Sequence, residues 1–140
     1  TYRAAFSVAC AGAGDCVTLY GFANVREIYI SKPSAAISVT LIKRSAVDTG
    51  GTASALTAVP MNSKNSASAV TVDSYTAVPT AGTAVGDLTP AISLATTDTL
   101  IQDFGLTGGQ SLALNSSSEG LAISVSGAVT LTGYVEWTEP

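Results

Sequence analysis

The sequence has no histidine and little charge, and these shortages exclude several classes of protein. Without histidine the chain lacks the commonest general base and the commonest metal-binding imidazole, so a Ser–His–Asp site cannot form. Charged residues are 11% of the 140 residues, against about 25% in an average soluble protein. Six basic and ten acidic residues give a net charge of −4, so we expect no nucleic-acid partner.

Long apolar runs are also missing. No window approaches the roughly 18 uninterrupted apolar residues of a membrane helix, so we expect no membrane partner. The segment Thr1–Phe6 shows no basic region followed by an apolar stretch of signal-peptide length. We therefore expect the protein to be made and used in a cytoplasm, or released from it by lysis.

Cysteine occurs only twice, as Cys10 and Cys16. Two sulfurs without histidine make a tetrahedral zinc site within one chain improbable. The pair could close a small disulfide loop across a hairpin turn, or both could be ordinary buried thiols. Because cytoplasmic proteins rarely keep disulfides, we expect buried thiols.

What the chain has in abundance is small residues. Ala, Gly, Ser and Thr together make half of it (22, 13, 17 and 18 residues). A hydrophobic content of 46% argues against disorder, which is typical of hydrophobe-poor, charge-rich chains. The length suits one compact domain, which we expect to span residues 1–140.

The hydrophobic pattern has a period of two almost throughout, which predicts strands. Val129, Leu131, Val135 and Trp137 fall on one face of their segment, and the polar residues between them on the other. No segment shows a helical pattern. We predict an all-β antiparallel β-sandwich, jelly-roll-like, because one apolar and one polar face is typical of such sheets. The predicted strands are 3–9, 16–20, 25–31, 36–44, 68–77, 91–94, 99–104, 110–115, 120–126 and 129–138.

The connections carry the remaining local signals. Ser126-Gly127 predicts a tight hairpin between the last two strands. Residues 45–67, rich in Gly, Ser and Asn, and residues 78–90, with two Gly and two Pro, are interpreted as long loops. Loops of this length in a compact domain are usually functional surfaces or arms.

Motifs for catalysis or cofactor binding are absent from the sequence. It has no phosphate-binding glycine loop and no Gly-x-Ser-x-Gly elbow. The ten acidic residues are scattered, with many at strand ends and turns, where Asp readily bonds to nearby backbone. We therefore expect no catalytic residue, no cofactor and no metal.

A few residues are candidates for contact with a partner. Trp137 is expected in the core or at the end of the sandwich, with an interface anchor as the alternative. The adjacent pair Lys43 and Arg44 is expected at a solvated strand end, or docked on an acidic partner surface. The N-terminal arm is a further candidate, formed by Thr1, Tyr2 and Arg3.

Several short segments carry a resemblance to a known family. They are Leu41-Ile42-Lys43-Arg44-Ser45, Thr49-Gly50-Gly51-Thr52, Leu56-Thr57-Ala58-Val59-Pro60, Tyr75-Thr76-Ala77-Val78-Pro79-Thr80, Glu119-Gly120-Leu121-Ala122-Ile123 and Val135-Glu136-Trp137-Thr138-Glu139. From about Arg26 to its C-terminus the chain resembles small all-β virion proteins encoded by tailed bacteriophages.

The resemblance implies a non-enzymatic structural protein of a phage particle, most plausibly a capsid decoration (cement) protein that stabilises the head lattice. The resemblance also implies that the partner is the major capsid protein or another virion protein. It implies that the protein is located in the virion, which is assembled in the host cytoplasm, and that it forms a homotrimer. The alternatives are a tail or fibre-associated accessory protein, which the same resemblance permits, and a carbohydrate-binding module. The module would need a row of exposed aromatics, and the five tyrosines lie on different segments: Tyr2, Tyr20, Tyr29, Tyr75 and Tyr134.

Overall fold

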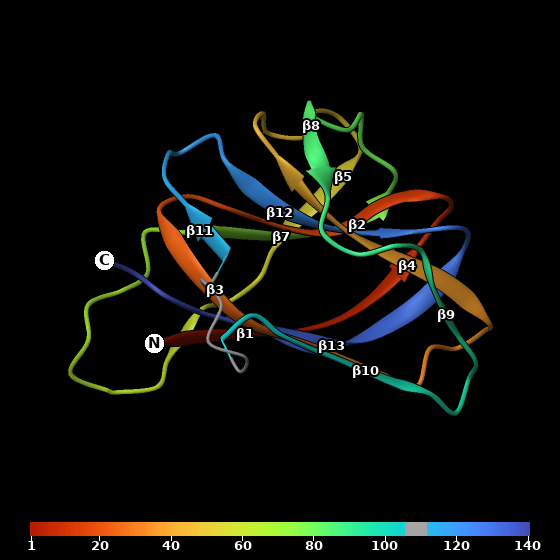
Figure 1. Cartoon of the computed structure of the whole chain (residues 1–140), viewed down its shortest axis with the longest axis horizontal. Helices are drawn as coiled ribbons and strands as arrows, with labels where there is room; N and C mark the ends of the chain where they lie inside the picture. The colour runs from red at the N-terminus through yellow and green to blue at the C-terminus, as the bar shows by residue number, and fades with distance from the viewer. Residues whose placement is uncertain (106–111) are drawn as a thin grey trace.

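The computed structural model describes residues 1–105 and 112–140, and over these ranges the chain forms strands and no helix (Figure 1). The predicted all-β class is therefore confirmed. The strands are β1 (Tyr2–Cys10), β2 (Gly14–Tyr20), β3 (Ala23–Ser31), β4 (Ile37–Arg44), β5 (Thr52–Ala55), β6 (Val59–Pro60), β7 (Thr71–Ala77), β8 (Ala84–Asp87), β9 (Ile92–Leu94), β10 (Thr99–Asp103), β11 (Leu112–Leu114), β12 (Gly120–Val125) and β13 (Val129–Thr138). Residues 110 and 111, the start of one predicted strand, lie outside the described residues.

The strands form two antiparallel sheets that pack against each other as the predicted sandwich. Sheet A has the order β10-β3-β13-β1-β6, with β11 also paired to β3. Sheet B has the order β5-β7-β2-β12-β4-β8, with β9 also paired to β4. The jelly-roll connection of these strands stays a prediction.

The apolar face of each long strand supplies the core between the sheets. In β13 the side chains of Val129, Leu131, Val135 and Trp137 are buried, whereas Thr130 is exposed. This alternation follows from the strand geometry, in which successive side chains point to opposite faces. The period-two reading of this segment is therefore confirmed residue by residue.

The hairpin predicted at Ser126-Gly127 is wrong. β12 belongs to sheet B and β13 to sheet A, so the chain crosses between the sheets at this point. Ser126 is held within sheet B, because its N–H donates to the Ser38 carbonyl and its hydroxyl accepts from the Ser38 N–H. The sequence of a short connection between two alternating segments does not show whether the two strands pair in one sheet or belong to different sheets.

The two predicted loops are also interrupted by strands. Residues 45–67 contain β5 and β6, and residues 78–90 contain β8. β5 and β8 are exposed along their whole length and lie at the two ends of the sheet B order. Since neither has a buried face, neither has the alternation from which a strand is predicted.

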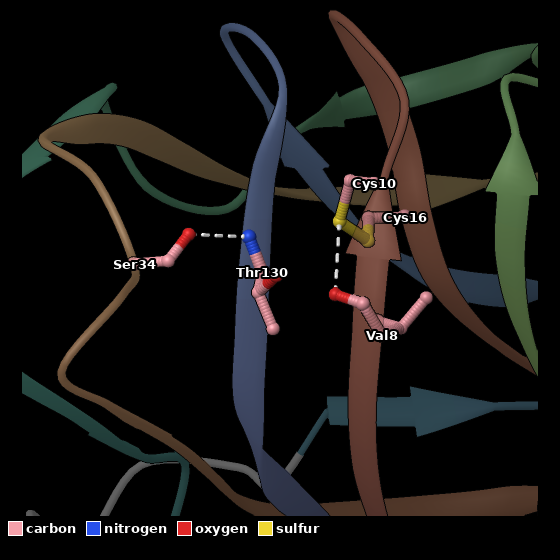
Figure 2. The surroundings of a disulfide bond; sticks show 5 residues. All are labelled: Val8, Cys10, Cys16, Ser34 and Thr130. Atoms are coloured by element: carbon pink, nitrogen blue, oxygen red, sulfur yellow. Dashed lines mark hydrogen bonds between the residues drawn. A yellow bond between two sulfur atoms is a disulfide. The ribbon is translucent and has the colours of Figure 1, made fainter.

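Cys10 and Cys16 form a disulfide, so the expectation of two buried thiols is wrong (Figure 2). The first cysteine ends β1 in sheet A and the second lies in β2 of sheet B. The short corner between these strands brings the two Cα atoms to 5.7 Å, within the usual range for a disulfide. The bond therefore joins the two sheets beside a corner of the chain and does not bridge a hairpin.

Candidate functional sites

Arg44 lies at the centre of a buried charge cluster on the outward side of sheet B. Its guanidinium donates to both carboxylate oxygens of Asp15, from Nε at 2.7 Å and from Nη2 at 2.8 Å. Nη1 donates to the Gly82 carbonyl at 2.8 Å. The residue is only 6% exposed, so the expectation of a solvated strand end is wrong for Arg44. It is also out of reach of a docking partner in this conformation.

A second carboxylate, Asp48, completes the cluster. Its Oδ1 accepts from the Tyr20 hydroxyl at 3.0 Å and from the Gly82 N–H at 2.8 Å, and lies 3.7 Å from Arg44 Nε. Its Oδ2 is buried and has no hydrogen-bond partner in the part of the chain that the structure describes. Two carboxylates therefore share one guanidinium inside the protein.

The charge imbalance is reflected in the titration of these groups. Burial, followed by the neighbouring Asp15 carboxylate, raises the pKa of Asp48 to about 6. Burial and the Asp48 carboxylate also raise the pKa of Tyr20, and the bond to Asp15 raises the pKa of Arg44. A buried carboxylate beside another carboxylate resists ionisation, because the medium does not screen the repulsion.

Residues 45–51 and 78–90, which we call the flap, cover this cluster. Thr49 and Thr80 bond to each other through both backbone N–H groups, and the Ser45 N–H donates to the Thr83 carbonyl. Four further side chains of sheet B are buried without belonging to the core between the sheets: Thr18, Tyr20, Tyr75 and Ala122. The centre of the outward side of sheet B is therefore covered.

Within residues 1–105 and 112–140, sheet A, in contrast, has its outward side open. The registers of β10, β3, β13 and β1 align their outward residues in rows across the sheet. The apolar row is Ile101, Tyr29, Tyr134 and Ala5. The row toward the C-terminal end of β13 is Asp103, Glu27, Glu136 and Arg3, and the row on the other side is Thr99, Ser31, Thr132 and Ser7. We call these three rows the open face.

Several side chains of the open face contact one another along and between the rows. The rings of Tyr29 and Tyr134 stack at 5.1 Å between centroids, 11° from parallel. The guanidinium carbon of Arg3 lies 4.0 Å from the centroid of the Tyr134 ring, and its Nη2 donates to Glu136 at 2.6 Å. Ile101, beside Tyr29, is 60% exposed. Ile101 therefore adds an exposed apolar side chain to a row whose two rings are already held by contacts.

The positions of the tyrosines show whether the protein has the row of exposed aromatic side chains that a carbohydrate-binding module needs. Tyr2, Tyr20 and Tyr75 are buried, so the structure brings only Tyr29 and Tyr134 together on an outward face. The two rings face each other, and the Tyr134 ring is also covered by Arg3. These rings therefore do not offer a shared flat platform to a sugar.

The other interface candidates lie in different surroundings. Tyr2 and Trp137 are buried and stack on each other at 5.9 Å, which puts Trp137 in the core. Lys43 is half-buried and donates to the Ala113 carbonyl. Thr1 accepts a backbone bond from Met61 and is half-buried. The residues of the predicted arm are thus docked on the sandwich, and Arg3 alone among the six candidates belongs to the open face.

Sequence reasoning missed Asp15, Asp48 and Tyr20 as a group, and the pair Tyr29 and Tyr134. The sequence around Asp48 was interpreted as part of the long loop 45–67, and nothing in it indicated that the carboxylate would be buried. The Tyr pair had a weak signal, since both residues fall on the polar phase of an alternating segment.

Within residues 1–105 and 112–140, no group of three or more His, Cys, Asp or Glu side chains is placed to hold a metal ion. In the same part of the chain, no helix has the length and apolar character to cross a membrane. Comparisons with protein-family models, curated proteins and solved structures found no match to this chain.

Proposed function

We propose that this protein is a non-enzymatic structural component of a bacteriophage virion, most plausibly a capsid decoration protein that stabilises the head lattice. The observation that carries the proposal is the open face of sheet A, an ordered row of outward side chains, whereas the centre of the outward side of sheet B is buried. Support from the sequence comes from the resemblance between about Arg26 and the C-terminus.

The chemistry of the open face suits docking on another protein. Its apolar row removes exposed area from water on contact, and its hydroxyl row adds short side chains that order at little entropic cost. The acidic row keeps its charges at one side of the contact, where Arg3 already pairs with Glu136. The partner we propose is the major capsid protein or another virion protein.

The disulfide supports a protein that acts outside the reducing cytoplasm. Disulfides persist on virion and cell surfaces and are reduced in most cytosols. In a virion protein made in the host cytoplasm, Cys10 and Cys16 would stay reduced until lysis. Dissolved oxygen would then oxidise the two thiols to the disulfide, taking up the two electrons and two protons. We propose that this is the order of events here.

Occupancy on purified particles tests the proposal. Ile101→Asp places a charge in the apolar row, whereas Val47→Asp is a matched control, because Val47 is 47% exposed and lies outside sheet A and outside the edge strands β5 and β8. Quantitative mass spectrometry of phage particles should find hundreds of copies of the wild type and of Val47→Asp, and a loss of ten-fold or more for Ile101→Asp. Equal loss for both variants would reject the open face as the contact surface.

The same measurement separates the alternatives. A few to dozens of copies per particle would indicate the tail or fibre-associated protein. Absence from particles, together with binding on a glycan array, would indicate the carbohydrate-binding module. Either result would overturn the decoration role.

A further inference from the structure

We propose that Asp48 is a pH-dependent latch that fastens the flap to sheet B when its carboxyl is protonated and loosens the flap when it ionises. The inference is independent of the virion role. It rests on the contacts of the buried cluster, in which the flap contributes Asp48 and Gly82 and the sheet contributes Asp15, Tyr20 and Arg44.

The two oxygens of Asp48 have unequal surroundings. Oδ1 accepts from the Gly82 N–H and shares the Tyr20 hydroxyl proton with the Ala46 carbonyl. Oδ2 is buried and has no donor among residues 1–105 and 112–140, so negative charge on it is unsolvated. A proton on Oδ2 removes that charge, and gives the group a donor beside the Asp15 carboxylate.

Arg44 cannot neutralise both carboxylates. Its Nε and Nη2 are committed to Asp15, and its Nη1 to the Gly82 carbonyl. With both acids ionised the cluster carries a net charge of −1 in a site where its three charged residues are 3% to 6% exposed. Burying an uncompensated charge is costly, so ionisation must oppose closure of the flap.

Other titratable groups around Asp48 do not supply the missing positive charge. From β2 it meets Asp15 and Tyr20, and from β4 Arg44. β7 brings Tyr75, which senses the charges of Asp48 and Asp15, and Asp73. From the second flap segment, 78–90, only the Gly82 N–H reaches Asp48. The one charged residue of this segment is Asp87 in β8, which pairs with Ile42 of β4.

The direction of the pH effect follows from linkage. The pKa of Asp48 is raised to about 6 with the flap closed, and an exposed Asp has a pKa of about 3.9. The closed flap therefore binds the proton more tightly than the open flap. The stabilisation of closure is fully present below the lower value and is lost as the pH rises through about 6.

Hydrogen exchange of the flap amides tests the proposal. After correction for intrinsic rates, the opening constant reported by the Gly82, Thr49 and Thr80 amides should rise about 100-fold from about pH 4 to about pH 8, since two pKa units correspond to that factor. Amides of β1 and β13 should show no comparable rise.

Two variants make the test specific. Asp48→Asn keeps an acceptor for Tyr20 and Gly82 and cannot ionise, so the rise should vanish. Asp87→Asn, an exposed acid in the same flap, should keep it. If wild type shows no rise, or if Asp48→Asn retains it, the latch is refuted.

A third variant covers the case in which Asp48→Asn fails to fold. Tyr20→Phe keeps the ring and removes a hydrogen bond that favours the ionised carboxylate. The midpoint of the opening transition should then move to higher pH. An unchanged midpoint would mean that Asp48 does not control the flap.

Discussion

At the scale of single residues, Lys43 and Arg44 show how differently two adjacent basic side chains can be used. Lys43 turns toward the end of the sandwich, where its ammonium lies 3.9 Å from Glu119 and remains 25% exposed. Arg44 points to the other side of β4 and is enclosed with two carboxylates. One residue of displacement along a strand therefore separates a solvent-screened ion pair from a buried one.

Replacing Arg44 should be far more damaging than replacing Lys43. Arg44→Ala leaves Asp15 and Asp48 buried without a cation, a change that costs about 3–5 kcal/mol. Lys43→Ala removes a partly exposed pair of about 1 kcal/mol or less. Urea denaturation at neutral pH measures both free energies of unfolding. Similar losses for the two variants would contradict the buried cluster.

Glycine matters most where two strands approach closely. Gly133 in β13 lies opposite Ile30 in β3, and a Cβ at this position would collide with the backbone of Tyr29. Gly86 in β8 has open space around the same position. The absence of a side chain is therefore a packing requirement only at the first of these glycines.

Gly133→Ala should destabilise the sandwich by about 2 kcal/mol or more, because β3 and β13 must shift apart. Gly86→Ala is the matched control and should change stability by less than about 0.5 kcal/mol. Thermal unfolding followed by circular dichroism compares the two. An unaffected Gly133→Ala variant would show that these strands tolerate separation.

At the scale of elements, the corners of the chain do more than the strands to define the sandwich. β1 and β2 diverge into different sheets over a few residues, and β12 and β13 do the same. The disulfide closes the first of these corners, with a sequence separation of 6 between its cysteines. It therefore restricts the separation of the sheets at that end.

Reduction of the disulfide should lower the free energy of unfolding by about 2 kcal/mol, the loop-closure value for so short a loop. Denaturation with and without reductant measures this. The variant Cys10→Ala/Cys16→Ala serves as the control, since reductant should leave its stability unchanged. A wild type that is indifferent to reductant would contradict a structural role for the bond.

At the scale of the whole molecule, β5 and β8 leave sheet B with two exposed edges. Each strand has one hydrogen-bonded neighbour, and its residues are exposed throughout. Such edges favour association with another strand unless charge or covering blocks it. The two strands hold a single charged residue between them, Asp87.

We therefore predict a closed oligomer, most plausibly a trimer, that persists in moderate salt. Low surface charge reduces the desolvation cost of contact, and a closed ring avoids fibres. Light scattering after size exclusion should give three times the mass of the chain over a wide range of concentration. A stable monomer at high concentration would overturn this prediction.

The sequence by itself determined the fold class and the core. Alternation of apolar and polar residues needs no knowledge of partners, because strand geometry alone sends Val129, Leu131, Val135 and Trp137 to one face. The lack of histidine likewise excluded a Ser–His–Asp site before any contact was known. The small number of basic residues argued against a nucleic-acid partner.

Only the tertiary structure decided which strands pair, whether the two cysteines form a disulfide and which charged side chains are buried. Ser126-Gly127 predicts a hairpin locally, yet the bonds to Ser38 in β4 place it at a corner. No sequence pattern connects Asp15, Arg44 and Asp48, which form one site because β2, β4 and the flap meet there. These outcomes depend on contacts between segments that are distant in the sequence, and a local pattern of residue types does not predict such contacts.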